Sequence, residues 1–422
     1  MQQETYAVIG SLFGDEGKGH TVQWLCKEAI RRGKNPIVVR FSGGSQAGHT
    51  VSDGRMKHIC SSYGSGVMEN VPTLIYDSGG SCSAYNHAYF DPIAACNEFY
   101  ALRQEYMKAY PDRVFEFEAP KLYVSSGVRI ITPYDMYSDR QDKKLLSDGT
   151  CGSGQWATHK RYEDNVNFKT SNPKDYLYQV YRYYTEQGNV YANDECEKFE
   201  EAFLDSIAAL PFETVRDVKS LVSEYDVVIM EGSQGLLLDA DKGFYPHVTS
   251  TSVGVSATFD FNKNVLNTEP SQCEYFFVTR TYMTRHGNGY RPLSFDDSEV
   301  EKHFRDEENE TNQTNRFQGV FKVGKYDTEM LHTAFQRHTL DNLQEKYNLR
   351  FNLAITHFDK LAPSKYLNAV IGDSSEEWNL EKYLAKVVES TGVNIVKVYT
   401  ASSPYADFTL RLDFQAENTK LS

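Results

Sequence analysis

The chain lacks the cysteine pattern of a disulfide-stabilised or zinc-binding protein. Its 422 residues include only seven cysteines, an odd number scattered along the sequence, and none of them forms a CxxC pair. Scattered thiols of this kind are typical of a reducing compartment. We therefore expect free thiols, no cysteine-based zinc site and a cytoplasmic location.

Long apolar runs and an excess of basic residues are also missing. No apolar segment approaches the roughly 18 residues of a membrane-spanning helix, and the first ten residues lack the basic and apolar regions of a secretory signal. Lys and Arg number 44 against 58 for Asp and Glu, a net charge of −14. Binding to a phosphate backbone needs a basic face. We therefore expect no membrane or nucleic-acid partner, while a local basic pocket for a small anion remains compatible with this charge.

What is present is an ordinary globular composition. Hydrophobic residues make up 40% and charged residues 24%, with 28 Gly and 13 Pro, which excludes a disordered or collagen-like chain. This length allows two or three domains, or one large domain with insertions. Because no shift in composition marks a linker, we predict a single large domain over residues 1–422, with insertions around 94–215 and 290–330.

Short apolar segments bounded by turns predict the buried strands of a parallel sheet. These segments are residues 6–10, 35–40, 226–230, 351–355 and 394–400. Polar residues gather at their carboxyl ends, where open parallel sheets bind ligands. We predict helices at 19–32, 94–110 and 195–210, and exposed loops at 158–176 and 296–314. The predicted fold is α/β: a large, mostly parallel central sheet with glycine-rich phosphate-binding loops at the strand ends and helical insertions, comparable to P-loop NTPases.

The most informative segment is Gly10–Gly19, which reads GSLFGDEGKG and follows the first predicted strand. Its glycines permit close backbone approach and positive φ angles, and the helix that follows would direct N–H groups at an anion. Lys18 adds a positive charge, and Asp15 places an acid among phosphate ligands. The GxxxxGK[ST] spacing of a Walker A loop is absent. The segment therefore predicts a phosphate-binding loop of another kind rather than a turn that serves packing alone.

Together with a second glycine-rich segment, Ser42–Thr50 (SGGSQAGHT), this loop resembles the adenylosuccinate synthetase family. Further matches follow in the order of that family. Its EGAQG-LLD-D, G-YP-VTSS, STRVGAGP and TKLD segments resemble, in turn, Met230–Asp241, Gly243–Ser250, Tyr282–Gly289 and Thr356–Asp359. The first two motifs together are highly specific, and the resemblance spans most of the chain.

The resemblance implies a ligase that joins aspartate to a 6-oxopurine nucleotide, IMP, at the expense of GTP, through a 6-phosphoryl intermediate. Asp15 would remove the N1 proton, and His49 would act as general acid beside the transferring phosphoryl group. Lys18 would neutralise the phosphoryl oxygens, and Gln234 would donate to the developing O6 anion. Asp15 and the Gly48 carbonyl would hold Mg²⁺, which prefers oxygen ligands. The family's active site borrows from a second subunit, which implies a homodimer.

The other site residues follow from the same matches. Beside the residues already named, the resemblance assigns to GTP Phe13, Gly14, Glu16, Gly17, Gly19, Thr50, His357, Asp359 and Thr400. A carboxylate such as Asp359 can accept from guanine N1–H and the 2-amino group together. Beside Gln234, it assigns to the purine nucleotide Gln46, Ala47, Thr150, Cys151 and Thr249. It assigns to the amino acid Thr314, Asn315, Arg316 and Lys322.

Several positions depart from the family pattern. The family has Asn, Thr, Arg and Lys where this chain has Gln46, Cys151, Ser153 and His357. The arginine-rich amino-acid loop of the family is reduced, within residues 314–322, to the cations Arg316 and Lys322. Arginine suits bidentate carboxylate recognition, so these changes bear on which amino acid and which purine are used.

Two alternatives to the IMP-using ligase stay open. A viral branch of the same family acts on dGMP in a 2-aminoadenine pathway and replaces the first-loop aspartate with serine. Asp15 favours the IMP-using branch, whereas the altered loops favour the viral one. The second alternative is a non-catalytic purine nucleotide-binding protein with the same fold. Asp15 and His49 argue against it, since a sensor needs no general base.

Overall fold

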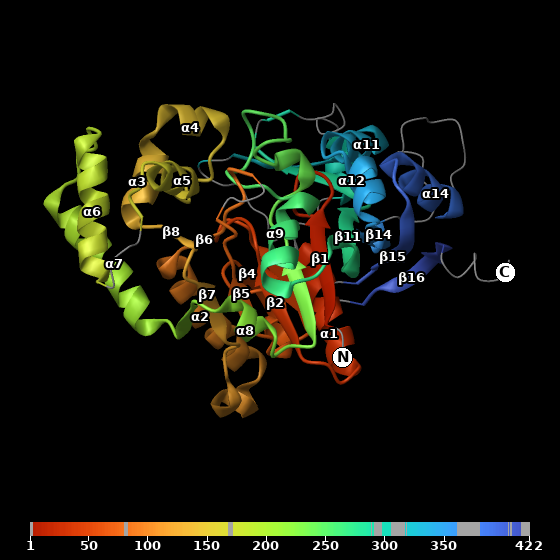
Figure 1. Cartoon of the computed structure of the whole chain (residues 1–422), viewed down its shortest axis with the longest axis horizontal. Helices are drawn as coiled ribbons and strands as arrows, with labels where there is room; N and C mark the ends of the chain where they lie inside the picture. Colours follow the sequence, from red (N-terminus) through yellow and green to blue (C-terminus); the bar gives the residue numbers. More distant parts are fainter. Residues whose placement is uncertain are drawn as a thin grey trace.

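A ten-stranded sheet runs through the centre of the chain (Figure 1). The computed structural model describes residues 3–79, 83–167, 172–287, 289–290, 298–304, 317, 319–360, 380–403, 405 and 407–414. From edge to edge the strands are β16 (Thr409–Asp413), β15 (Ile395–Thr400), β14 (Arg350–Thr356), β11 (Cys273–Arg280), β1 (Glu4–Gly10), β10 (Val227–Glu231), β2 (Pro36–Arg40), β5 (Thr73–Ile75), β7 (Leu122–Ser125) and β9 (Phe212–Val215). Neighbouring strands are parallel except for the β15–β16 pair. The predicted fold class is confirmed.

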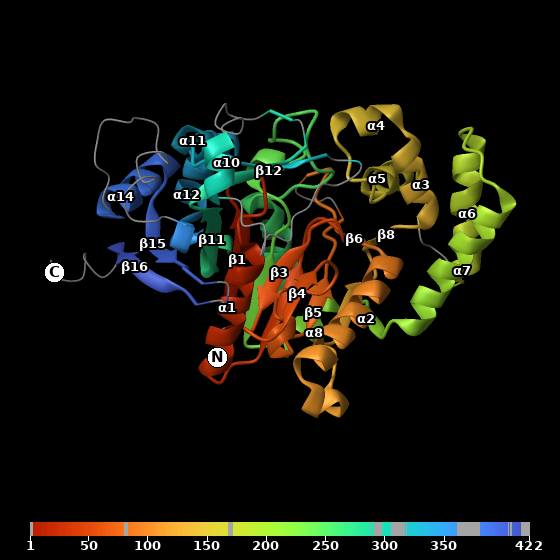
Figure 2. The same cartoon turned by 180° about the vertical axis from the view of Figure 1, so that it is seen from behind.

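The sheet is buried on both faces, which explains its continuous apolar strands. Alternate side chains of a strand point to opposite faces. Val8 of β1 packs with Val22 of helix α1 (Lys18–Arg31) on one face, whereas Ala7 and Ile9 pack in the core on the other. Burying one such aliphatic side chain stabilises the fold by about 1.5–3 kcal/mol. Figure 2 shows α1 beside the sheet, with the hairpin of β3 (His49–Ser52) and β4 (Lys57–Cys60) next to it.

Helices cover the sheet, and a further group of helices lies beside one end of it (Figure 1). The three predicted helical segments correspond to α1, α2 (Pro92–Ala109) and α7 (Asn193–Ala209). The other helices are α3 (Pro133–Gln141), α4 (Lys143–Asp148), α5 (Gln155–Glu163), α6 (Pro173–Glu186), α8 (Val218–Val222), α9 (Phe259–Phe261), α10 (Ser298–Phe304), α11 (Thr328–Arg337), α12 (Leu340–Tyr347) and α14 (Leu380–Thr391). Two further strand pairs are β6 (Tyr89–Phe90) with β8 (Arg129–Ile130), and β12 (Tyr282–His286) with β13 (Phe321–Lys325).

Both predicted loops are wrong in part. Residues 158–176 contain the end of α5 and the start of α6, whose buried stripe includes Tyr176, Leu177 and Val180. Because tyrosines lie among its apolar residues, the helical spacing of this segment is not evident from the sequence. Of the predicted loop at 296–314, residues 298–304 form α10, and the others lie outside the described residues. The predicted single domain and its two insertions stay a prediction, although Figure 1 shows α3 to α7 gathered at one end of the molecule.

Two absences predicted from the sequence can be compared with the described part of the chain. The cysteines in it, which are Cys26, Cys60, Cys96, Cys151, Cys196 and Cys273, are free thiols. Among the helices of the described ranges, none combines the length and the apolar character needed to cross a membrane.

Candidate active site

A cavity of about 550 Å³ opens at the carboxyl ends of the central strands. Strands β1, β10 and β2 are neighbours in the sheet, so the loops that follow them meet at this edge. Many predicted site residues line the cavity: Phe13, Asp15, Lys18, Gln46, Ala47, Gly48, His49, Thr50, Thr150, Cys151, Gln234 and Thr249. Segments that are far apart in the sequence therefore line one cavity.

The loop between β1 and α1 needs glycine for a specific steric reason. Gly17 has a φ of 96°, and a Cβ at this position would lie 2.7 Å from the Thr356 Cγ2 atom. Thr356 Oγ1 in turn donates a hydrogen bond to the Glu16 carbonyl at 2.7 Å. The end of β14 thus packs directly on the loop. Gly14 and Gly17 belong to this loop and Gly19 to the first turn of α1, and none of the three is among the described residues that line the cavity.

Glu16, predicted as a GTP contact, faces the protein interior. Its carboxylate accepts from the Leu12 N–H at 2.5 Å and the Gly14 N–H at 3.3 Å, and it lies 3.7 Å from Lys18 Nζ. Burial raises the pKa of Glu16 to about 7, against the lowering effect of Lys18. Glu16 therefore engages two amides that a phosphate could use, a feature that the sequence did not reveal.

Asp15 lies on the cavity wall with a φ of 57°. Its carboxylate Oδ2 is 3.2 Å from His286 Nε2, and its side chain is 22% exposed. Burial raises the pKa of Asp15, but the hydrogen bond from His286 and the charges of His286, Arg280 and Lys18 outweigh it, and the net shift is downward. Asp15 is therefore held as a carboxylate, the form that a general base requires.

His49 is held by a buried carboxylate from another strand. Its Nδ1 lies 2.5 Å from Oε1 of Glu231, the last residue of β10. Glu231 also accepts from the Ser65 N–H at 2.9 Å and from the Ser65 hydroxyl. Since a carboxylate only accepts, Nδ1 carries the proton and Nε2 remains for a ligand. Burial lowers the pKa of His49 despite Glu231. Burial raises the pKa of Glu231, but His49, Arg40 and Ser65 bring it to about 2.

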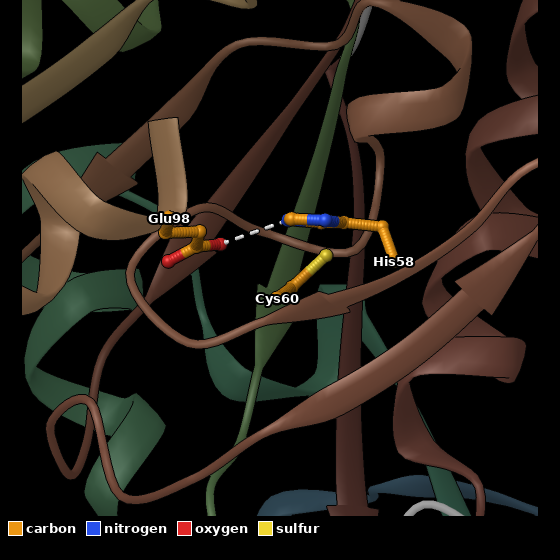
Figure 3. Close-up of side chains that lie close together, drawn as sticks. All are labelled: His58, Cys60 and Glu98. Carbon is orange, nitrogen blue, oxygen red and sulfur yellow. Dashed lines mark ion pairs between the residues drawn. The ribbon is translucent and has the colours of Figure 1, made fainter. Parts of the chain in front are cut away.

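A second buried cluster stands behind this pair. Figure 3 shows His58 and Cys60 from β4 and Glu98 from α2 converging, with their ligand-type atoms within 4.8 Å of one another. These side-chain types can hold a transition metal. Here, however, the Glu98 carboxylate accepts from the Ser61 N–H at 3.0 Å and the Ser61 hydroxyl at 2.7 Å, and His58 Nδ1 contacts Glu105 at 2.6 Å. We assign the cluster a structural role.

That role is to hold the turn that delivers Ser65 to Glu231. Glu98 also accepts from the Ser62 N–H at 2.5 Å and from the Tyr63 N–H at 3.3 Å, in the turn that leads to Ser65. The His58 imidazole, 3.5 Å from Glu98 through Nε2, helps to offset the buried charge. Side chains behind the cavity therefore fix the orientation of His49 through the turn.

The His58 contacts predict a pH-dependent stability. Burial lowers the pKa of His58, but Glu98 and Glu105 outweigh it and raise the pKa above its ordinary value of 6.5. When the pKa of a histidine is higher in the folded than in the unfolded state, its protonation stabilises the fold. This stabilisation is fully present below the unfolded-state pKa and is lost as the pH rises through the folded-state pKa. We expect His58→Asn to lower the melting temperature more at pH 6 than at pH 8.5. An equal loss at both values, measured by calorimetry, would contradict a charged His58.

The glycine-rich loop at 149–154 forms the opposite wall of the cavity. Thr150 Oγ1 donates to Asp139 Oδ2 at 3.0 Å, and the Cys151 thiol donates to Ser153 Oγ at 3.3 Å. Burial raises the pKa of Cys151, so the thiol stays protonated. The residues that depart from the family pattern therefore present neutral polar groups to the cavity, with Gly154 at the start of α5.

The predicted guanine-reading residues form a separate group. His357 and Asp359 follow β14, and Thr400 ends the neighbouring strand β15. The Phe358 N–H donates to the Ala401 carbonyl at 2.9 Å, which joins the two segments. Asp359 is exposed, whereas burial holds the pKa of His357 well below its usual range. These residues are brought together next to the phosphate loop, since Thr356 contacts Glu16.

The predicted amino-acid site is described only in part. Thr314, Asn315 and Arg316 lie outside the described residues. Lys322 lies on β13, opposite Arg285 in the β12–β13 pair. In the described lining of the cavity, the β12–β13 hairpin is represented by Arg285 and His286 rather than by Lys322.

Sequence reasoning missed several charged or polar residues of the cavity. Arg285 is buried, with its guanidinium carbon 4.4 Å from the centroid of the Phe13 ring. Arg140 donates from Nε to the Gly152 carbonyl at 2.8 Å. His286 and His247 also line the cavity. Arg285 and His286 stand inside the Tyr282–Gly289 match, but the motif alone did not assign them a function.

A mostly parallel sheet with a cavity of polar side chains at the carboxyl ends of its strands is typical of α/β enzymes that bind nucleotides. Similarity to known proteins identifies the family within this class of enzyme. The sequence profile of the family described as adenylosuccinate synthetase matches residues 7–361. The adenylosuccinate synthetase of Acidithiobacillus ferrooxidans is 28% identical over 317 residues, which cover 70% of this chain and 67% of that protein. That of Neisseria meningitidis is 29% identical over 306 residues, which cover 69% of this chain and 65% of that protein.

Solved structures share the fold. Fully ligated adenylosuccinate synthetase from Plasmodium falciparum superposes with a TM-score of 0.68 at 18% identity, covering 97% of this chain and all of that one. Succinoaminodeoxyadenylate synthetase of cyanophage S-2L, bound to dGMP and dATP, gives 0.59 at 14% identity, covering 100% and 99%. The chain belongs to the adenylosuccinate synthetase family. It is an enzyme of this carbon–nitrogen ligase type, and its activity lies in purine biosynthesis.

Proposed function

We propose that the enzyme joins L-aspartate to C6 of IMP in a reaction that consumes GTP and proceeds through a 6-phosphoryl intermediate. The observation that carries this proposal is the convergence of Asp15, His49, Lys18 and Gln234 on one cavity. A base, a carboxylate-bound imidazole, a cation and an amide are the groups that phosphoryl transfer to a purine oxygen requires.

Each group has one task in the proposed reaction. Asp15 accepts the N1 proton, and O6 attacks the γ-phosphorus of GTP. The new O6–P bond forms as the bond between the γ-phosphorus and the bridging oxygen breaks, and GDP leaves. In its imidazolium form, with Nδ1–H held by Glu231, His49 would donate from Nε2 to a transferring phosphoryl oxygen. Lys18 contacts the same oxygens, and Gln234 donates to O6. The aspartate amine then attacks C6, the C6–O6 bond breaks and phosphate leaves, while the amine loses its proton.

The residues present fit a magnesium ion. Asp15 and Gly48 both line the cavity, and a carboxylate and a backbone carbonyl are the kinds of oxygen ligand that Mg²⁺ prefers. When bound, the ion would neutralise phosphate charge. Asp15 and Gly48 would hold it at the phosphate end of the cavity, beside His49.

A dGMP-using ligase is the second candidate. It is favoured by Cys151 and Ser153, which replace the family's threonine and arginine in the wall of the cavity. A steady-state assay of phosphate release with GTP, aspartate and either IMP or dGMP separates the two. Release with neither nucleotide would support the non-catalytic alternative instead.

The donor assignment gives a further prediction. Asp359→Asn replaces an acceptor for guanine N1–H and the 2-amino group with an amide that can donate to xanthine O2. We expect GTP to bind about thirtyfold more weakly, as for the loss of hydrogen bonds to a charged group, while XTP binds more tightly. Calorimetric titration of both nucleotides measures this exchange. A wild-type preference for ATP over GTP would contradict the role of Asp359.

The amino-acid site, the subunit arrangement and the location are also proposals. Thr314, Asn315, Arg316 and Lys322 would orient the aspartate carboxylates, and turnover with other amino acids tests this choice. A homodimer would complete each active site from the second subunit, as the family resemblance implies, and sedimentation velocity measures the assembly. The free thiols fit a cytoplasmic enzyme.

A further inference from the structure

The wall of the cavity that lacks the family's arginine has another arginine beside it. Ser153 stands where the family pattern has arginine, and Arg140, near the end of α3, lines the same cavity. Arg140 Nε donates to the carbonyl of Gly152, the residue directly before Ser153, at 2.8 Å. The guanidinium is therefore anchored next to the loop position at which the family's cation is missing.

An aromatic ring holds the guanidinium from a second side. The guanidinium carbon of Arg140 lies 5.3 Å from the centroid of the Phe317 ring. The same ring packs on Gly152, where an added Cβ would lie 2.7 Å from Phe317 Cδ2. Phe317 belongs to the segment 314–322, to which the resemblance assigns the amino-acid site. The 149–154 loop, the end of α3 and the amino-acid segment therefore meet at Arg140.

The guanidinium keeps donors for a ligand. Nε is engaged by Gly152, but the terminal nitrogens of an arginine also carry N–H donors. Arg140 is exposed, and it forms no ion pair with any residue that the structure describes. Asp91, an acid of the same cavity, instead accepts from the Ile93 and Ala94 N–H groups at 3.0 and 3.1 Å. The terminal nitrogens of Arg140 can therefore bind an anionic group that enters the cavity.

We propose that Arg140 replaces the family's loop arginine and binds a carboxylate of the amino-acid substrate. The inference rests on the proposed function, because that function supplies an amino acid with a side-chain carboxylate. A guanidinium binds a carboxylate through two parallel N–H···O bonds, a geometry that a lysine does not provide. The contact with Phe317 places this cation beside the amino-acid segment, whose own cations are reduced to Arg316 and Lys322.

The test measures aspartate binding by calorimetry, with IMP and a non-hydrolysable GTP analogue already bound. Arg140→Met keeps an unbranched side chain over Phe317 but removes the donors. We expect it to bind aspartate about tenfold or more weakly, as for the loss of hydrogen bonds to a charged group, with IMP affinity within about threefold of wild type. Adding Ser153→Arg to this variant returns a guanidinium to the loop and should recover most of the lost affinity.

Two further variants complete the test. Arg140→Lys keeps the charge without the planar fork, and its aspartate affinity should fall between those of wild type and Arg140→Met. Arg182→Met is the matched control, because Arg182 is an exposed arginine of α6 that donates to Glu186 at 2.8 Å. It should bind aspartate as wild type does.

Two results would overturn the proposal. One is an unchanged aspartate affinity in Arg140→Met, and the other is a loss confined to IMP, which would make Arg140 a contact of the nucleotide phosphate. Failure of the proposed function gives a different result. An enzyme that releases no phosphate from GTP with IMP and aspartate still reports how much aspartate affinity Arg140→Met loses.

Discussion

Asp15→Asn is expected to lower kcat by about three orders of magnitude while both nucleotides bind within about tenfold of wild type. The amide cannot accept the N1 proton, and loss of a general base costs on the order of 10²–10⁴ in rate. Asparagine keeps the size of the side chain and tolerates the φ of 57° better than alanine would. Its Oδ1 can still accept from His286. Steady-state phosphate release and calorimetric binding measure the two effects separately.

The matched control for this variant is Asp53→Asn. Asp53 is exposed in the β3–β4 turn, where its Oδ1 accepts from the Arg55 N–H at 2.9 Å, a bond that an asparagine oxygen can also make. Its turnover should equal that of wild type. If Asp15→Asn retained more than about a tenth of the wild-type kcat, the acid–base role of Asp15 would be wrong.

The fold was predictable where a strand leads into a glycine-rich or polar turn. β1, β2, β10 and β14 were found because each combines an apolar run with such a turn. β11 was not predicted, although it lies between β1 and β14 and is almost wholly buried. Its carboxyl end continues into β12 without a glycine-rich turn, so the pattern that marks the other strands is missing there.

The site was predictable where its residues share one loop. Asp15 and Lys18 are fixed by the spacing of a single turn, and so are Gly48 and His49. Contacts between distant segments leave no such signal. Glu231 was part of a recognised motif, yet nothing in the sequence shows that it meets His49, because their contact depends on the packing of β3 beside the end of β10.

Glu16 shows the same limit within one loop. The sequence places it between phosphate-binding residues, but the structure turns its carboxylate toward the Leu12 and Gly14 amides. The direction of a side chain depends on backbone angles such as the φ of 96° at Gly17. Composition and spacing do not determine those angles, so the inward orientation had to be observed.

The His49–Glu231 pair predicts opposite outcomes for two conservative variants. His49→Asn places an amide donor near the position of Nδ1, so it can keep the bond to Glu231 while Nε2 is lost. We expect a normal melting temperature and a kcat lower by about 10²–10⁴, the usual contribution of a positioned acid. His49→Gln extends its amide toward the position of Nε2 and leaves the Glu231 carboxylate without this donor.

The glutamine variant should therefore lose stability as well as rate. Glu231 is 1% exposed, and His49 is the strongest of the contacts that lower its pKa to about 2. Removing one partner of a buried charged group costs about 1–3 kcal/mol, which denaturant unfolding can measure, although Ser65 still donates to the carboxylate. If the asparagine variant kept full turnover, Nε2 would have no part in the reaction. If both variants were equally stable, the His49 bond would not be what stabilises Glu231, and Ser65 and Arg40 would suffice.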